Sequence, residues 1–215
     1  MITKRDLEIL IFMQENGGKT FMEVLEKTFF EGRAGAKRRI QILINDGLLK
    51  RRPTGLLKPA NMIVFGENAR ESFYQMWGVE PKRAKLSSVM VRHEMSQQLA
   101  HYWLNKLDGT VKRTTINQDF GKFHHVPDLI WENERLGQIF FEIELNKKTN
   151  KRYLDIFTKS EKDGARNIIY ILASEKDRDS YMEHLPKASI LKFISIDELV
   201  HNIKTTGKIN AKSQI

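Results

Sequence analysis

The sequence predicts an α/β protein of two domains: helices and a β-hairpin over residues 1–78, then an α/β domain with a mixed central sheet over residues 87–205. Two observations predict this division. Apolar residues recur with helical spacing over the first 45 residues, whereas extended apolar runs alternate with helical segments after residue 110. Residues 79–86, with one proline and three bases, have the composition of a linker, and residues 206–215 that of a polar tail.

In the first domain the periodicity predicts three helices followed by a hairpin. The helices are Asp6–Glu15, one that begins after Thr20, and Ala34–Asn45. Thr20 and Glu23 have the spacing of a capping box for the second helix. Two extended runs, Leu48–Arg52 and Asn61–Phe65, then flank a turn with Pro and Gly, and a further helix covers Glu67–Trp77. Three helices followed by a basic hairpin predict a winged helix-turn-helix.

The charge is concentrated in this domain. The chain of 215 residues carries 36 basic and 27 acidic side chains, a formal net charge of +9, and the segment Glu31–Ala60 alone carries +6. Such a cluster is typical of a phosphate-binding surface, and the alternative is a solvated helix face followed by a basic turn. The absence of cysteine excludes disulfides, thiolate zinc sites and cysteine nucleophiles.

The segment Ile40–Arg52 resembles the passage from recognition helix to wing in winged-helix DNA-binding proteins. The resemblance implies double-stranded DNA as a partner, with Lys37, Arg38 and Gln41 at base edges, since Arg pairs with guanine and Gln with adenine. Arg39 flanks this face, and the remaining bases would hold phosphates: Arg33, Arg51, Arg52 and Lys58. A winged helix used for protein contacts would instead expose an apolar or acidic face.

The second domain alternates helices and strands, which predicts a mixed sheet. The expected order is helix Ser88–Leu107, strands Thr110–Asn117, Val126–Glu132 and Gly137–Leu145, helix Lys148–Lys162, strand Asn167–Ala173, helix Lys176–His184, strand Ile190–Ile194 and helix Ile196–Ile203.

Three carboxylates in this domain fall on neighbouring strands. Asp128 follows Pro127 at the start of one strand, and Glu142 and Glu144 share one face at the end of the next. Together they could provide oxygen ligands for a hard cation such as Mg²⁺. The alternative is an ordinary strand edge with solvated acids. The adjacent His124 and His125 face opposite sides of an extended chain, so they are poor joint metal ligands.

This pattern resembles the PD-(D/E)xK nuclease superfamily, which has a restriction-endonuclease-like fold. The resemblance implies that Asp128 and Glu142 hold Mg²⁺, with Glu94 of the upstream helix as the extra acidic ligand. Glu144 occupies the position where the family has its catalytic Lys. Three lysines follow closely, and Lys148 is the residue taken to replace it.

Over residues 5–200 the chain resembles the replication-relaxation proteins of plasmids and other mobile elements. This implies a sequence-specific DNA-binding protein with a replication, mobilisation or relaxosome accessory role, whose partners include a relaxase, replication or recombination protein and whose nuclease-like domain has lost catalysis. Two alternatives stay open, a Mg²⁺-dependent endonuclease and a transcriptional regulator with a dimerisation or sensing domain. We expect a cytoplasmic protein with no membrane partner, and a homodimer would suit a palindromic site.

Overall fold

A computed structural model describes residues 2–85, 90–114, 119, 121–184 and 190–213. The chain forms two compact units, Met1–Gln98 and Leu99–Ile215, and it is a mixed α/β protein as predicted. Parts of the predicted helix Ser88–Leu107, strand Thr110–Asn117 and polar tail lie outside the described residues. Among the described helices, none is both long and apolar enough to cross a membrane.

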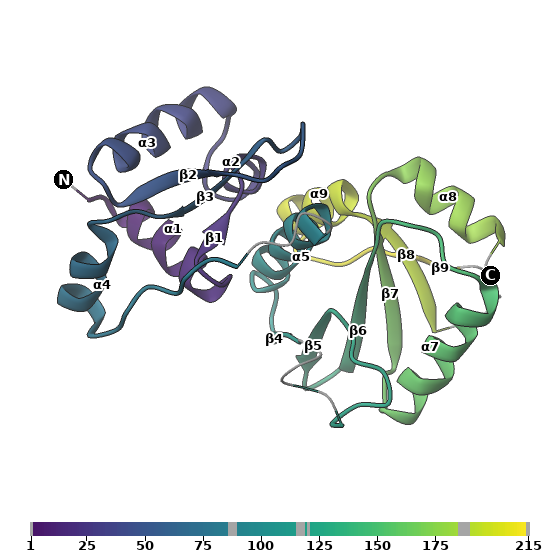
Figure 1. Cartoon of the computed structure of the whole chain (residues 1–215). Helices are drawn as coiled ribbons and strands as arrows, with labels where there is room; N and C mark the ends of the chain where they lie inside the picture. The colour runs from purple at the N-terminus through teal and green to yellow at the C-terminus, as the bar shows by residue number, and fades with distance from the viewer. Residues whose placement is uncertain (1, 86–89, 115–118, 120, 185–189, 214–215) are drawn as a thin grey trace. The chain divides into compact units, whose positions relative to one another are not determined.

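The first unit places its helices on a three-stranded antiparallel sheet (Figure 1). Its elements are α1 (Lys4–Glu15), β1 (Lys19–Thr20), α2 (Met22–Phe29), α3 (Arg33–Asn45), β2 (Leu49–Pro53), β3 (Asn61–Phe65) and α4 (Ala69–Trp77). The strand order is β1-β3-β2, so the predicted hairpin is confirmed, with Leu49 opposite Phe65 and Arg51 opposite Ile63. The core of this unit gathers apolar side chains from the helices and from one face of the hairpin.

Three predicted helix starts in this unit are wrong, and one of them is that of α4, which begins at Ala69 and not at Glu67. The first helix begins at Lys4, because the Thr3 side chain caps it and forms a capping box with Asp6. Thr20 caps nothing: it lies in β1 opposite Ile63, and its hydroxyl donates to Gln98 Oε1 (2.9 Å). The non-local pairing with β3 satisfies Thr20, and α2 begins without a side-chain cap.

The chain after α4 is held against the first unit. Residues 80–85, which we call the strap, contain no helix or strand. Gln14 joins α1 to the strap twice, because its Nε2 donates to the Glu80 carbonyl (3.0 Å) and its Oε1 accepts from the Lys82 N–H (2.7 Å). Lys19 Nζ donates to the Lys85 carbonyl (2.8 Å). The predicted linker segment is therefore anchored to the first unit along most of its length.

The second unit is built on a mixed sheet with strand order β4-β5-β6-β7-β8-β9. Its elements are α5 (Val91–Leu104), which begins in the first unit, β4 (Thr110–Arg113), β5 (Leu129–Asn133), β6 (Gly137–Glu144), α7 (Asn150–Lys162), β7 (Asn167–Leu172), α8 (Glu175–His184), β8 (Leu191–Ser195), α9 (Ile196–Thr206) and β9 (Lys212–Ser213). The β6-β7 and β7-β8 pairs are parallel and the other pairs antiparallel, so the predicted mixed sheet is confirmed.

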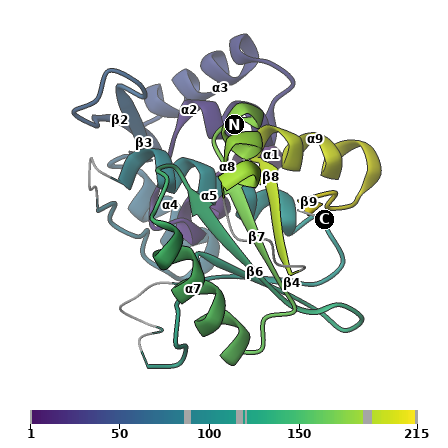
Figure 2. The same cartoon turned by 90° about the vertical axis from the view of Figure 1, so that its right-hand side faces the viewer.

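Helices cover both faces of this sheet (Figures 1 and 2). α7 and α8 cover one face, where Tyr153 and Tyr181 join the core around Phe140 and Phe193. α9 and the end of α5 lie on the other side, and Lys204 of α9 stacks over Trp103 of α5 (4.8 Å). The tail prediction needs correction, because residues 212–213 form β9 and pair with β8.

Candidate nucleic-acid interface and carboxylate site

The helix α3 separates apolar from basic side chains. Ala36, Ile40 and Leu43 are fully buried, and these positions recur with helical spacing along one side. Three of the basic side chains predicted to bind DNA are exposed: Arg38 opposite the buried side, Lys37 beside it, and Arg33 at the first residue of the helix. Ile42, also on this helix, is 39% exposed. α3 thus presents a basic surface with one apolar residue at its centre.

A hollow of about 570 Å³ lies beside this surface. It is lined by Thr3, Lys4, Arg5, Phe30, Gly35, Arg38, Arg39 and Ile42. The Arg5 guanidinium stacks over the Phe30 ring at 5.1 Å, which holds it beside α3. Lys4 and Arg5 were not among the predicted DNA contacts, and the only sequence signal for them is their position ahead of Asp6. They extend the basic surface of α3 onto α1.

Arg39 is engaged inside the first unit. Its Nε donates to Asp6 Oδ1 (2.8 Å), and a second guanidinium nitrogen donates to Asp6 Oδ2. Burial favours the neutral form of Asp6, but the bonds from Arg39 and Thr3 outweigh this and lower its pKa. The side chain of Arg39 is 24% exposed. This geometry gives Arg39 a structural role, so we remove it from the DNA-contact set.

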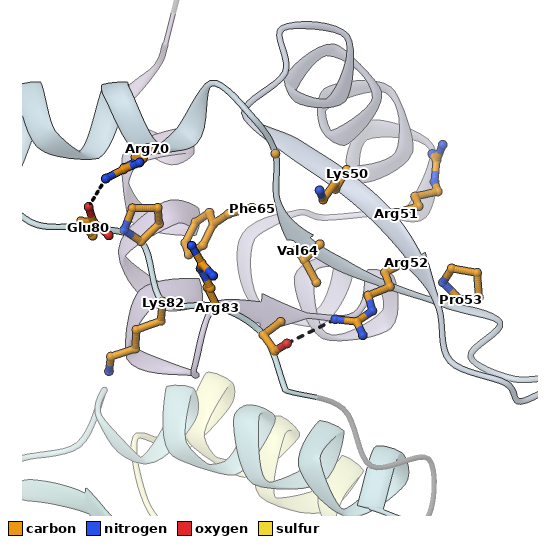
Figure 3. A pocket seen from close by; sticks show the side chains of 13 residues that line it. Lys50, Arg51, Arg52, Pro53, Val64, Phe65, Arg70, Glu80, Lys82 and Arg83 are labelled. Carbon is orange, nitrogen blue, oxygen red and sulfur yellow. Dashed lines mark hydrogen bonds and ion pairs between the residues drawn. The ribbon is translucent and has the colours of Figure 1, made fainter.

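The predicted wing residues divide between two faces of the hairpin. Arg51 is opposite Ile63 in the register, on the face that packs toward α3, whereas Arg52 is opposite Met62 on the other face. Figure 3 shows the Arg51 side chain pointing away from Lys50 and Arg52. Lys58 is exposed in the turn between β2 and β3, and Gln41 Nε2 donates to Asn45 Oδ1 (2.8 Å) along the surface of α3.

In the second unit the structure brings Asp128 and Glu142 together. Asp128 directly precedes β5, and its Oδ2 accepts from the Ile143 N–H of β6 (2.7 Å). Glu142 is only 6% exposed, and its Oε1 is hydrogen-bonded to His125 Nε2 (2.8 Å). Burial is the main cause that raises the pKa of Glu142, and the charge of Asp128 raises it further against the opposing effects of His125 and Lys148.

Glu144 and Lys148 form an ion pair next to these two acids. Lys148 Nζ contacts Glu144 Oε2, and Glu144 is 4% exposed. The Lys148 backbone N–H donates to the Tyr153 hydroxyl (3.0 Å), which anchors the segment before α7. Lys148 is close enough to Glu142 to act on its charge. The four predicted catalytic residues therefore gather at the carboxyl end of β6.

The sequence predicted that His124 and His125 are poor joint metal ligands, but the His125 side chain is hydrogen-bonded to Glu142. Asp163 at the end of α7 positions it, because its carboxylate accepts from the backbone N–H groups of His124 and His125 (both 3.0 Å). The His124 ring also contacts Asp163 (2.6 Å). The only local signal for His125 is its place three residues before Asp128, and Asp163 lies 38 residues further along the chain.

The residues present fit a Mg²⁺ site only in part. Asp128 and Glu142 supply two neighbouring carboxylates, but His125 occupies one oxygen of Glu142. Glu94, the third predicted ligand, belongs to the first unit, where its carboxylate pairs with Lys19 (3.4 Å). Within the described ranges, no group of three or more His, Asp or Glu side chains is placed to hold a metal ion.

Comparisons with known proteins give no match. No protein-family model matches the chain, and neither the curated proteins nor the solved structures contain one that matches it.

Proposed function

We propose that this protein binds double-stranded DNA as a winged-helix protein, and that its second unit is a nuclease-like domain with an accessory role in the replication or mobilisation of a mobile genetic element. The observation that carries the proposal is the basic surface of α3. Arg38 is exposed opposite the buried side of this helix, with the exposed Lys37 beside it and the exposed Arg33 at the start of the helix. The partner of the second unit would be a relaxase, replication or recombination protein.

The geometry supports a division of labour among the basic residues. Lys37 and Arg38 lie in the first half of α3, which would enter the major groove. Gln41 lies one turn further along the helix. Arg33, Lys4 and Arg5 surround the start of α3, and Arg51 lies on the hairpin face toward it, so these residues would contact phosphates. Ile42 would contact a thymine methyl group.

Fluorescence anisotropy with labelled duplexes tests this proposal. We expect Arg38→Ala to weaken binding to a selected site by about fivefold or more, because loss of a base contact costs about 1–3 kcal/mol. The same change should reduce discrimination against random DNA. Arg51→Ala should weaken all sequences alike and reduce the salt slope by about 0.9. Lys176→Ala, an exposed base on α8, is the control. Absence of binding to any duplex at low salt would contradict the proposal.

A second candidate function is metal-dependent DNA cleavage. It is favoured by the neighbouring carboxylates of Asp128 and Glu142 and by Lys148 beside them. The incomplete set of metal ligands and the Glu144 side chain at the usual Lys position favour the non-catalytic role.

Incubation of the protein with supercoiled plasmid and Mg²⁺ or Mn²⁺ separates these two functions. The nuclease would be established if Asp128→Ala abolishes cleavage and Glu132→Ala preserves it. Glu132 is the control because it is an exposed acid on strand β5, away from the carboxyl end of β6. If the wild-type protein neither cleaves nor binds the metal in calorimetry, the non-catalytic role stands.

A further inference from the structure

A second basic surface lies on the other face of the hairpin. The strap and the strands β2 and β3 enclose a groove of about 640 Å³, shown in Figure 3. Val64 lines the groove between the hairpin and the strap. Lys50 and Arg52 reach the groove from β2, and Arg83 reaches it from the strap. The first unit thus carries basic side chains on both faces of one hairpin.

The charges in this groove are not neutralised by neighbouring acids. Among the described residues that line it, Glu80 is the only acid, and its carboxylate pairs with Arg70 (2.5 Å). Arg52 donates to the Ala84 backbone carbonyl (3.3 Å), which leaves its positive charge uncompensated. Within the part of the chain that the structure describes, Lys50 and Arg83 have no ion-pair partner. Lys50, Arg52 and Arg83 therefore line the groove around an apolar patch, and among the described residues no carboxylate balances their charges. The patch consists of Val64, Pro81 and Ala84.

The strand geometry places these cations in a row. Lys50 and Arg52 lie two positions apart on β2, so their Cα atoms are about 7 Å apart and their side chains share one face. Cations spaced along a strand match a chain of phosphates better than a single compact anion. An apolar patch between them suits the sugar carbons that lie between phosphates.

We propose that this groove binds the sugar–phosphate backbone of a nucleic acid, as a contact separate from the surface of α3. The inference deepens the proposed function and rests on it. Arg51 also borders the groove, but its side chain points away from Lys50 and Arg52, so the side chains of these two residues extend the interface past the edge of the wing. Contacts to phosphates carry no sequence information, and the groove would therefore add affinity without altering the choice of site.

The strap packs closely against the backbone at Gly18. A side chain at Gly18 would place its Cβ atom 2.0 Å from the Lys82 carbonyl oxygen, so the strap packs where only glycine leaves room. Gly17 has nearly the same backbone conformation, with φ of 73° against 78°, but has no atom within 4 Å of such a Cβ. Alanine at either position brings the same backbone strain, and only Gly18→Ala also displaces the strap.

The test measures the salt dependence of binding of the full chain to a labelled random-sequence duplex. We expect Arg83→Gln and Lys50→Gln each to reduce the slope of log K against log salt by about 0.9, with discrimination between sites unchanged. Lys85→Gln is the matched control, because it removes the same charge from an exposed position of the same strap and Lys85 does not line the groove. Gly18→Ala should weaken binding more than Gly17→Ala.

The outcomes distinguish this inference from the function on which it rests. If wild-type protein binds and both groove variants behave like Lys85→Gln, the groove proposal is wrong while α3 remains the DNA surface. If the groove variants reduce the slope and Arg38→Ala has no effect, the groove stands and the role of α3 fails. If no duplex is bound at low salt, both fail. Circular dichroism of each glycine variant checks that the first unit is folded.

Discussion

Each unit buries a carboxylate beside a basic side chain, Asp6 in the first unit and Glu142 in the second. Their surroundings shift the pKa values of these two groups in opposite directions. Asp6 is fully buried, and it meets a guanidinium that forms two bonds to it and a threonine that caps with it. Glu142 is almost as buried, but it has one bond from His125 and a second acid, Asp128, beside it. The pKa of Asp6 is lowered and that of Glu142 is raised.

The difference separates a structural acid from a candidate functional one. A buried carboxylate whose bonds outweigh its desolvation stabilises the fold, as Asp6 does for α1 and α3. A buried carboxylate whose charge is opposed by desolvation and by a like charge costs stability, and such groups cluster at functional sites. Glu142 fits this second description.

The largest expected effect concerns Asp6. We expect Asp6→Ala to destabilise the first unit by about 3 kcal/mol, because it removes a cap and leaves the Arg39 charge without its partner. Glu80→Ala, which breaks an exposed pair with Arg70, should cost less than about 1 kcal/mol. Denaturant unfolding together with hydrogen exchange in α1 and α3 measures both changes.

The lowered pKa of Asp6 also predicts how the stability of the first unit depends on acidic pH. Since the folded pKa of Asp6 is lowered, its contribution is present above its ordinary value of 3.8 and is lost as pH falls below it. An Asp6→Asn variant should lose this part of the acid dependence. Equal costs for Asp6→Ala and Glu80→Ala would show that the buried pair has no special role.

A smaller effect of opposite sign is expected at Glu142. We expect Glu142→Gln to stabilise the second unit by on the order of 1 kcal/mol at neutral pH, because it removes a desolvated charge beside Asp128 and keeps a partner for His125. Since the folded pKa of Glu142 is raised, its cost grows as pH rises above 4.5, so the gain should be greater at pH 7.5 than at pH 5.

Glu144→Gln provides the matched comparison. It lies on the same face of β6 and is equally buried, but its charge is paired with Lys148. We expect this change to destabilise the unit by about 1 kcal/mol, since Lys148 loses its charged partner. If both variants shift stability in the same direction, the contrast between the two glutamates is wrong.

The sequence predicted the local elements well because their signals are local. Gly78 ends α4 with a left-handed φ of 65°, and the Pro and Gly of the turn mark the hairpin between β2 and β3. The strand alternation also placed Glu142 and Glu144 on one face. Thr20 was misassigned because a strand of two residues has no periodicity, and its pairing with Ile63 is not visible in the neighbouring residues.

The state of each site residue depends on partners far along the chain. Whether Arg39 faces DNA is decided by Asp6, which lies 33 residues earlier, and His125 reaches Glu142 because Asp163 holds its backbone. Arg52 and Arg51 looked equivalent in the sequence, and the register of β2 against β3 sends them to opposite faces. Charge pattern therefore predicted where cations gather, and tertiary contacts decided which are available.

The smallest effects concern two tyrosines around Glu142, whose rings contact each other at 5.5 Å. Tyr153 accepts from the Lys148 N–H, whereas the buried hydroxyl of Tyr170 has no hydrogen-bond partner among the described residues and lies on β7 opposite Glu142. We expect Tyr153→Phe to cost about 1 kcal/mol and Tyr170→Phe to be neutral or stabilising, because an unsatisfied buried hydroxyl is costly. Thermal unfolding of both variants gives the comparison. A loss of stability in Tyr170→Phe would show that its hydroxyl bonds to Glu142 in solution, and Glu142 would then have a second donor and resemble Asp6 more closely.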